Sequence, residues 1–195
     1  MTTPPALPTP AHTVGPFYGY ALPFPGGGDA APAAHPDTLT LHGHVRDGAG
    51  APVPDALLEF WGPDPDGELP RATGSLRREP ATGGFLGRDG VRFTGFARVP
   101  TDADGHWTVR TLRPGARGGN APHLAVCVFA RGLTRHLFTR VYLPAPDREP
   151  TTDPLLAALS PERRATLWAA AEPQGSYRFD IRLQGAAETV FLEFA

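Results

Sequence analysis

Residues 41–68, LHGHVRDGAGAPVPDALLEFWGPDPDGE, hold two candidate strands and two turns, and they decide the fold class. The segment 38–45, TLTLHGHV, alternates between apolar and polar positions, as does a strand with one buried face. Asp-Gly, Gly and Pro follow, and they suit a turn because Gly accepts positive φ and Pro fixes φ. A second apolar run, ALLEFW at 56–61, ends in the turn-forming GPDPDGE. Short alternating strands bounded by turns predict antiparallel β structure.

Short apolar runs separated by turns continue to the end of the chain. Gly contributes 23 and Pro 24 of the 195 residues, a density of turn formers that disfavours long helices. One late helix is expected, with Ser160 as N-cap, Pro161 at its first position and Pro173 beyond its end. The sequence therefore predicts a mainly β fold, an antiparallel β-sandwich with one late helix and an extended N-terminal arm. Further strands are expected at 91–98, 107–112, 123–130, 136–143, 177–183 and 189–194.

The run at 123–130 is apolar almost throughout, which indicates a strand buried on both faces. The leader is the opposite case, because Pro, Gly and Ala dominate it and no periodic pattern is present. Its aromatic residues are Phe17, Tyr18, Tyr20 and Phe24. We expect residues 1–36 to form an arm that packs at a subunit interface, and 37–195 to form the sandwich domain. The alternative is that the leader is disordered.

Charge and cysteine content exclude several classes of function. The formal net charge is −2, so no basic excess favours nucleic acid, and all 18 basic residues are Arg. A single cysteine, Cys127, excludes a disulfide within the chain, and its apolar surroundings predict an inert thiol. The N-terminus has no signal-peptide pattern, and no apolar run reaches the roughly 20 residues that span a bilayer. A soluble cytoplasmic protein is expected.

The histidines are the first candidates for chemistry, because no phosphate-binding loop, HExxH motif or nucleophile elbow is present. His42 and His44 are two residues apart on one predicted strand, so both side chains point the same way. A shared metal ion is possible there, but no further ligand is near in sequence, and a polar strand face is favoured. His106 is isolated in sequence and is expected at the surface or at a strand edge. His123 begins the apolar run and indicates a hydrogen-bonded core histidine, and Arg131, just after the run, indicates a solvated turn residue.

Five blocks of sequence carry a resemblance that extends from residue 9 to residue 194. The leader TPAHTVGPFY at 9–18 is similar to TPSQT-x-GP-[YF], and 41–68 is similar to G-x-V-x-D-G-x-G-x-P followed by a strand ending in E-[IFV]-W. The block TDADGHWTVRTLRPG at 101–115 is similar to D-x-x-G-x-[WY] followed by [KR]-P-G. The most specific blocks are APHLAVCVFARGLTRHLFTRVYL at 121–143 and YRFDIRLQGAAETVFLEF at 177–194. Together they resemble the alpha chains of intradiol ring-cleavage dioxygenases of the protocatechuate 3,4-dioxygenase type.

The resemblance implies that this chain has lost a metal site. In the iron-bearing chains of the family, two Tyr and two His hold a ferric ion. The positions of the tyrosines fall at Leu69 and Arg117, and those of the histidines at His123 and Ala125. Leu69 and Ala125 have no lone pair to donate, and the guanidinium of Arg117 stays protonated. The resemblance thus implies that this chain binds no metal and contributes no catalytic residue.

The resemblance also implies a role in a hetero-oligomer. An iron-bearing beta subunit of the same enzyme would hold Fe(3+) and cleave 3,4-dihydroxybenzoate (protocatechuate) with O2 to 3-carboxy-cis,cis-muconate. This chain, inactive alone, would line the partner's substrate site with Thr13, Gly15 and Pro16 of the leader and with Arg131.

Two alternatives stay open. A transthyretin-like β-sandwich binding module shares the strand patterns of 41–61 and 101–107, although it does not require the leader or the two C-terminal blocks. A stand-alone intradiol enzyme with a rebuilt metal site would need other ligands, with His42 and His44 as the candidates.

Overall fold

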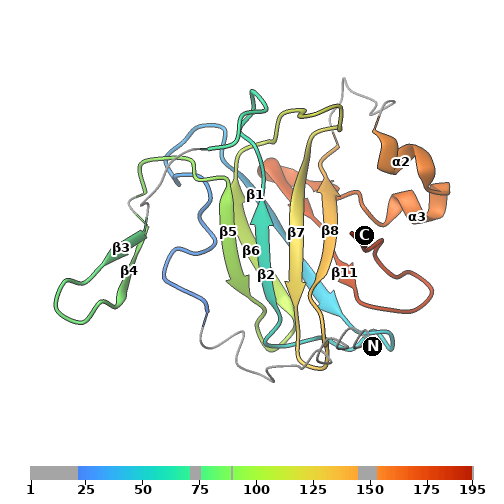
Figure 1. Cartoon of the computed structure of the whole chain (residues 1–195), viewed down its shortest axis with the longest axis horizontal. Helices are drawn as coiled ribbons and strands as arrows, with labels where there is room; N and C mark the ends of the chain where they lie inside the picture. Colours follow the sequence, from blue (N-terminus) through green and yellow to red (C-terminus); the bar gives the residue numbers. More distant parts are fainter. Residues whose placement is uncertain (1–21, 71–75, 89, 145–152, 195) are drawn as a thin grey trace, which may run out of the picture.

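A computed structural model describes residues 22–70, 76–88, 90–144 and 153–194, and its main body is a two-layer β-sandwich (Figure 1). The first sheet is built around β1 (Leu39–Arg46). One edge of β1 pairs antiparallel with β6 (His106–Thr111). Its other edge pairs in parallel with β10 (Ser176–Arg178) and β11 (Ile181–Arg182), and β9 (Ala170–Glu172) extends the sheet beyond β10.

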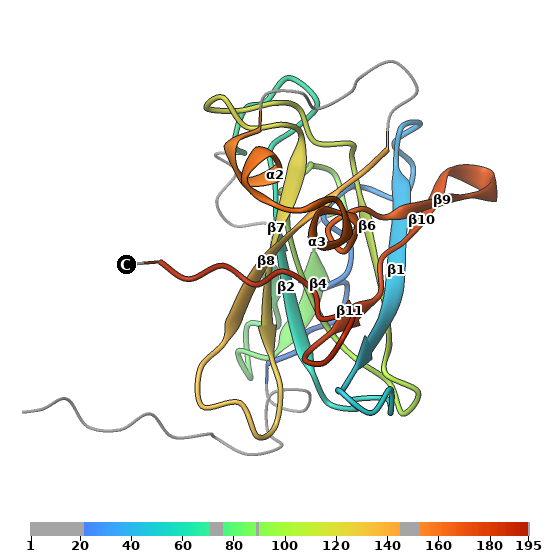
Figure 2. The ribbon, with the colours of Figure 1, turned by 90° about the vertical axis from the view of Figure 1, so that its right-hand side faces the viewer.

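The second sheet has four strands in the order β5-β2-β7-β8, and all of its pairs are antiparallel. Its strands are β5 (Phe96–Pro100), β2 (Leu57–Trp61), β7 (His123–Phe129) and β8 (Leu137–Tyr142). Figure 2 shows this sheet as one layer and β1 with β10 as the other. The predicted β-sandwich is confirmed, and the strands expected around residues 38–45, 56–61, 107–112, 123–130 and 136–143 are all present.

Alternation along the strands builds the core between the two sheets. On β1 the residues Leu39, Leu41, Gly43 and Val45 are buried, and the positions that alternate with them are partly exposed. The indole of Trp107 on β6 packs against the ring of Phe60 on β2, with 4.8 Å between the centroids. Burying a large apolar side chain contributes roughly 1.5–3 kcal/mol, so these contacts between the layers stabilise the sandwich.

Residues 22–36, the described part of the leader, lie against the sandwich of their own chain. The backbone oxygens of Gly27 and Gly28 accept hydrogen bonds from Arg98 N and Arg110 N, each at 2.8 Å. A Cβ on Gly27 would lie 2.4 Å from the carbonyl oxygen of Arg98, so only glycine permits this approach. Phe24 is buried in the same segment. This segment therefore joins β5 of one sheet to β6 of the other.

The late helix is shorter than predicted and is preceded by another. Helix α2 (Pro154–Ala158) is capped by Asp153, and α3 (Pro161–Ala165) is capped by Ser160, which accepts from Arg163 N. The helix does not continue toward Pro173, because Leu167 and Ala169 instead exchange backbone hydrogen bonds with Tyr142 of β8. A 3-10 turn, Pro173–Gly175, follows β9. None of the helices in the described ranges is long and apolar enough to cross a membrane.

Three strand predictions need correction. The strand expected at 91–98 begins only at Phe96, because Gly95 has φ +64 and a Cβ there would lie 2.4 Å from the oxygen of Gly62. The strand expected at 177–183 is broken into β10 and β11, and both run parallel to β1, so the first sheet is mixed. The segment 189–194 forms only an isolated bridge between Leu192 and Phe138.

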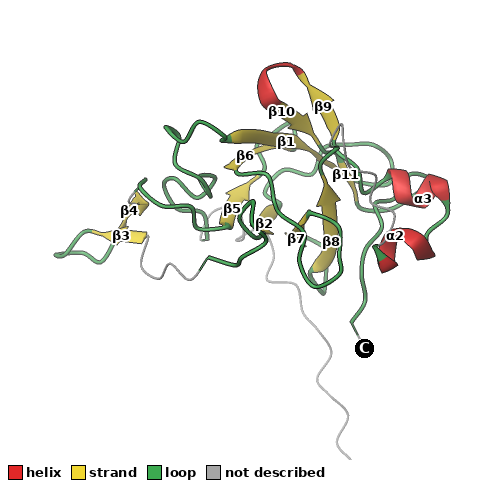
Figure 3. Ribbon diagram, turned by 90° about the horizontal axis from the view of Figure 1, so that it is seen from above, coloured by secondary structure: helices red, strands yellow, loops and turns green. Residues whose placement is uncertain are grey.

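A small hairpin stands away from the body. It consists of β3 (Leu76–Arg78) and β4 (Phe85–Arg88), and it projects on the side opposite helices α2 and α3 (Figure 3).

Candidate functional site

The four positions of the implied metal site lie at one end of the four-stranded sheet. β2 ends there and leads into the loop that carries Leu69, and β7 begins there with His123 because the two strands are antiparallel. The loop with Arg117 leads into β7. Gly115 N donates to Asp64 O at 2.8 Å, so the loops after β2 and after β6 are in direct contact.

Three of these four positions offer no metal ligand. Leu69 is 38% exposed. Arg117 donates from Nη1 to the backbone oxygen of Gly67 at 3.0 Å, and the same nitrogen lies 3.8 Å from the carboxylate of Glu68. Ala125 is exposed on the outer face of β7. An aliphatic side chain, a paired cation and a methyl group supply no lone pair.

His123 is the one position that keeps a ligand side chain. Its Nδ1 lies 2.8 Å from the backbone oxygen of Ala121 and donates to it, which leaves Nε2 as the free nitrogen. Burial lowers the pKa of His123, so the imidazole is neutral near pH 7. A hydrogen bond of this kind also orients imidazoles that bind metals, but one nitrogen does not hold an ion. Ferric iron does not fit the donor set at these positions, and the described residues contain no cluster of three or more His, Cys, Asp or Glu that could hold a metal.

A buried carboxylate occupies the neighbourhood of His123, and sequence reasoning missed it. Asp153 is fully buried, and its Oδ2 accepts from Ala121 N and from the hydroxyl of Tyr142, both at 3.0 Å. Its Oδ1 accepts from Leu155 N at 2.9 Å and from Leu156 N at 3.4 Å. Asp153 therefore links the entry to β7, the end of β8 and the start of α2. The Asp-Pro pair at 153–154 is a helix-start signal that could have identified it.

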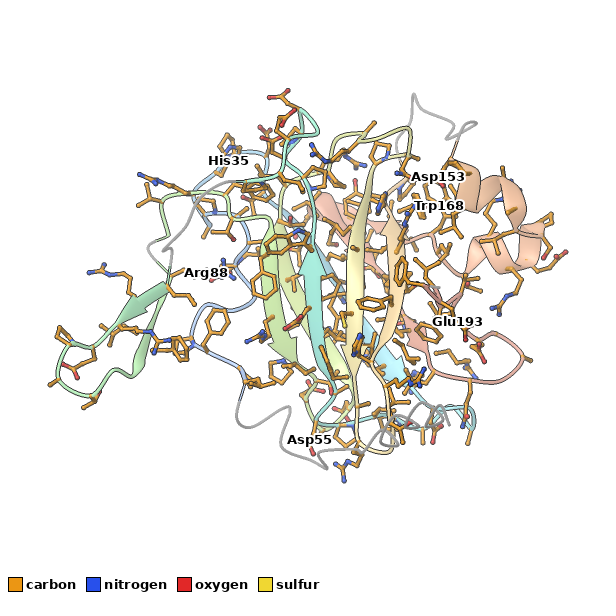
Figure 4. All side chains as sticks on the ribbon, in the orientation of Figure 1. His35, Asp55, Arg88, Asp153, Trp168 and Glu193 are labelled. Carbon is orange, nitrogen blue, oxygen red and sulfur yellow. The ribbon has the colours of Figure 1, made fainter. Side chains whose placement is uncertain are left out.

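Tyr142 and Arg140 complete this polar network. The Tyr142 ring packs against those of His123 and Trp168, with 5.5 Å between centroids in each pair, and burial raises its pKa to about 12. Arg140 Nη1 lies 3.6 Å from the carboxylate of Asp153 and donates to Tyr142 Oη at 3.3 Å. A neutral phenol, a carboxylate and a guanidinium thus stand beside the histidine, and Figure 4 shows Asp153 and Trp168 on the same side of the sheet.

The outer face of the four-stranded sheet is unusually apolar for a surface. Its cross-strand rows include Phe96, Trp61, Ala125 and Arg140; Arg98, Glu59, Cys127 and Phe138; and Pro100, Leu57 and Phe129, of which Leu57 is fully buried. On the same side of the sheet His123 pairs with Tyr142. Its charges are largely paired, since Arg98 Nε donates to Glu59 Oε1 at 2.8 Å and Arg140 faces Asp153. Trp61 is 49% exposed. Of the predicted two-sided burial of β7, the inner side is confirmed, whereas Ala125 on the outer side is exposed in this chain.

Arg131 follows β7 at the opposite end of this face. It is 52% exposed, and its Nη2 donates to Asp55 Oδ2 at 2.6 Å. A solvated turn arginine, the simple interpretation from the sequence, therefore has a partner. The other residues implied to line a substrate site, Thr13, Gly15 and Pro16, lie outside the described residues.

The outer face of the first sheet brings His106 next to His42 and His44, which are two residues apart on β1. His106, which is isolated in sequence, is the partly exposed first residue of β6 and pairs with His44 of β1. His42 Nδ1 lies 3.3 Å from His106 Nε2, and His42 Nε2 lies 2.8 Å from Glu172 Oε2. Burial first and the neighbouring His44 second lower the pKa of His106. The cluster is a polar strand face, as favoured from the sequence.

Cys127 is the single thiol of the chain. Burial and then the carboxylate of Glu59 raise its pKa to about 12. The thiol therefore stays protonated at neutral pH, in agreement with the predicted inert cysteine.

Comparisons with known proteins place the chain in a family. No family model matches the sequence. The protocatechuate 3,4-dioxygenase alpha chain of Burkholderia cepacia is 41% identical over 202 residues, which cover 95% of this chain and 96% of that protein. The protocatechuate 3,4-dioxygenase alpha chain of Pseudomonas putida is 34% identical over 207 residues, with the same coverage.

Solved structures agree with the fold. The dioxygenase domain of a dioxygenase and carbohydrate-binding protein fusion from Streptomyces sp. SirexAA-E matches with a TM-score of 0.55 and 27% identity, over 92% of this chain and 99% of that chain. An intradiol ring-cleavage dioxygenase from Tetranychus urticae matches with a TM-score of 0.59 over 91% and 97%, at an identity of 15% that shows the fold alone. With this fold and two relatives above 30% identity over nearly its whole length, the chain belongs to the intradiol dioxygenase family, among the protocatechuate 3,4-dioxygenase alpha chains.

Proposed function

We propose that this chain is the iron-free alpha subunit of a protocatechuate 3,4-dioxygenase and that it completes the substrate site of an iron-bearing beta subunit. The assembled enzyme would take 3,4-dihydroxybenzoate and O2, break the ring bond between the two hydroxylated carbons, and release 3-carboxy-cis,cis-muconate. The ferric ion would belong to the partner, and this chain would supply shape and charge at the entrance of that site.

The donor set at the implied metal positions carries the proposal. Leu69, Arg117 and Ala125 supply no ligand, and the remaining candidate, His123, is neutral with one free nitrogen. A chain in a dioxygenase family that lacks the ligands of its own reaction needs a partner that has them. The names of both curated relatives, which are alpha chains, favour the same arrangement.

The apolar outer face of the β5-β2-β7-β8 sheet supports a partner of the same kind of fold. Trp61, Ala125 and Phe138 lie on it, and its Glu59–Arg98 pair is internally neutral. A face with exposed apolar side chains and paired charges is suited to packing against another protein surface. We therefore assign this face to the contact with the beta subunit.

Arg131 would provide a cation for the anionic substrate. Only its Nη2 is engaged among the contacts of the described residues, so the remaining donors of the guanidinium can bind a carboxylate. An exposed arginine contributes on the order of 1 kcal/mol to such an attraction. We expect Arg131→Ala in the assembled enzyme to raise KM about five-fold and to lower kcat less.

Co-purification with a beta chain tests the proposed partnership. Ala125→Glu places a charge at an exposed point of the apolar face, so the chain should fold but lose its partner on a sizing column. Thr108→Glu is the matched control, because Thr108 is exposed on the outer face of the other sheet, on β6. Its complex should elute like that of the wild type.

The outcomes separate the proposal from its rivals. Protocatechuate-dependent oxygen uptake in the complex but not in the chain alone supports the alpha-subunit role. Association of Ala125→Glu as tight as that of wild type would move the interface elsewhere. If the wild-type chain does not associate with a beta chain, the proposed alpha-subunit role is refuted.

A further inference from the structure

The geometry points to Asp55 as a positioning residue for Arg131: its carboxylate fixes the guanidinium at the end of β7, where an anionic substrate would meet it. This inference rests on the proposed function, because Arg131 is assigned there to the entrance of the partner's site. Asp55 itself would touch neither substrate nor iron.

The ladder between β2 and β7 brings the two residues together. Leu57 pairs with Phe129 at the last rung, and Asp55 and Arg131 each lie two residues beyond it on the same side. They therefore face each other where the sheet ends, and Figure 4 shows Asp55 at that end. The bond from Arg131 Nη2 to Asp55 Oδ2 measures 2.6 Å.

The contact restrains the Arg131 side chain and leaves most of its N–H donors available. The side chains of Arg131 and Asp55 are 52% and 46% exposed, so both remain accessible to a solute. A guanidinium has five N–H donors in a fixed plane, and this bond uses one nitrogen. Holding one corner of the plane lowers the rotamer entropy that a long side chain loses when it binds a ligand.

The backbone at Asp55 makes the choice of residue informative. Its φ is +61, in the left-handed region that glycine adopts most readily, and only Gln174 shares a positive φ among the described non-glycine residues. Asp and Asn tolerate this conformation better than other side chains do. Glycine would relax the turn, whereas aspartate adds a carboxylate that faces Arg131.

The positive φ at Asp55 also determines which substitutions can test the inference. Asp55→Asn keeps the shape, the tolerance of positive φ and one oxygen acceptor, and it removes the charge. Asp55→Gly removes the contact and leaves the backbone unstrained, so neither substitution threatens the fold. The matched control is Asp29→Asn, because Asp29 of the segment 22–36 forms a similar partly exposed pair, at 2.6 Å, with Arg110 of β6 in the other sheet.

The test is steady-state oxygen uptake by the co-purified complex with protocatechuate and with catechol, which lacks the carboxylate. We expect Asp55→Gly to raise the KM for protocatechuate by a factor of about two, less than Arg131→Ala does, since the freed side chain keeps its charge but loses more rotamer entropy on binding. Asp55→Asn should raise it less, because its amide oxygen still accepts the hydrogen bond. In both variants kcat and the KM for catechol should stay near wild-type values, as should all parameters of Asp29→Asn.

A double-mutant cycle distinguishes failure of this inference from failure of the proposed function. If Arg131→Ala raises the KM for protocatechuate and adding Asp55→Gly raises it no further, the positioning role holds. If Arg131→Ala raises KM but Asp55→Gly leaves it unchanged or lowers it, Asp55 merely screens the arginine, and this inference alone is overturned. If Arg131→Ala itself has no effect, both the entrance role of Arg131 and the role of Asp55 are refuted.

Discussion

Replacing Asp153 by alanine should destabilise the chain strongly, because this buried carboxylate accepts four hydrogen bonds. The donors are Ala121 N, Tyr142 Oη, Leu155 N and Leu156 N. Losing the N-cap of α2 costs about 1 kcal/mol. Leaving the buried Ala121 N–H without an acceptor costs about 1–3 kcal/mol. The guanidinium of Arg140, 3.6 Å away, also loses its counter-charge.

These contributions are not additive, and a total of about 3–5 kcal/mol is expected, as for other broken buried charge pairs. Tyr142→Phe is the matched control, because it removes one donor and leaves the carboxylate and the helix cap in place. Its expected cost is about 1–2 kcal/mol. Asp153→Asn should fall between the two, because it keeps one acceptor oxygen for the cap but presents donors where acceptors are needed.

Urea denaturation of the purified chain, followed by circular dichroism, measures these differences. With a slope of about 3 kcal/mol per molar urea, Asp153→Ala should lower the midpoint by at least about 1 M. A loss below about 1 kcal/mol for Asp153→Ala, or an equal loss for Tyr142→Phe, would refute the reasoning that Asp153 is the centre of this network.

Two further predictions concern acid stability and loop packing. The folded chain holds the pKa of His106 below its usual value, so the unfolded chain takes up a proton more readily. The free energy of unfolding should therefore fall as pH drops through about 6.5. Thermal unfolding between pH 5 and 8 measures this fall, and His106→Gln should make it shallower. Gly115→Ala should destabilise the chain by about 1–3 kcal/mol, because a Cβ there would lie 2.4 Å from the backbone nitrogen of Gly67, whereas Gly84→Ala should be nearly neutral in the same urea experiment.

Sequence reasoning found the strands whose pattern is local. The alternation at 38–45 and the turn residues on both sides of 56–61 predicted β1 and β2, because one face of each strand is buried against the opposite sheet. The apolar run at 123–130 predicted a strand, which is confirmed, although only the inner of its two faces is buried throughout. These features depend on the order of apolar, polar and turn-forming residues along the chain, which the sequence shows directly.

Features that depend on contacts between distant segments were missed. The residues of 177–183 do not indicate that this segment runs parallel to β1, because strand direction and register depend on the path of the intervening chain. The helix after Ser160 stops early because Leu167 and Ala169 gain hydrogen bonds to Tyr142, a tertiary alternative that propensity does not contain.

The candidate site divides in the same way. The resemblance identified Leu69, Arg117, His123 and Ala125 from motifs, and the structure places them at one end of one sheet. The network around Asp153 was not predicted, because its partners come from three separate segments. Long-range pairing, rather than residue type, gives those side chains their environment.

The central claim is that this chain has no ferric site and acts through a partner that has one. Metal analysis and visible absorption of the chain purified alone, and of the chain co-purified with a beta subunit, test it most directly. The account predicts less than about one-tenth equivalent of iron and no phenolate-to-iron absorption in the chain alone, with about one iron per alpha–beta pair in the complex. One equivalent of tightly bound ferric iron in the chain alone, with the colour of phenolate ligation and with ring-cleaving activity, would contradict it.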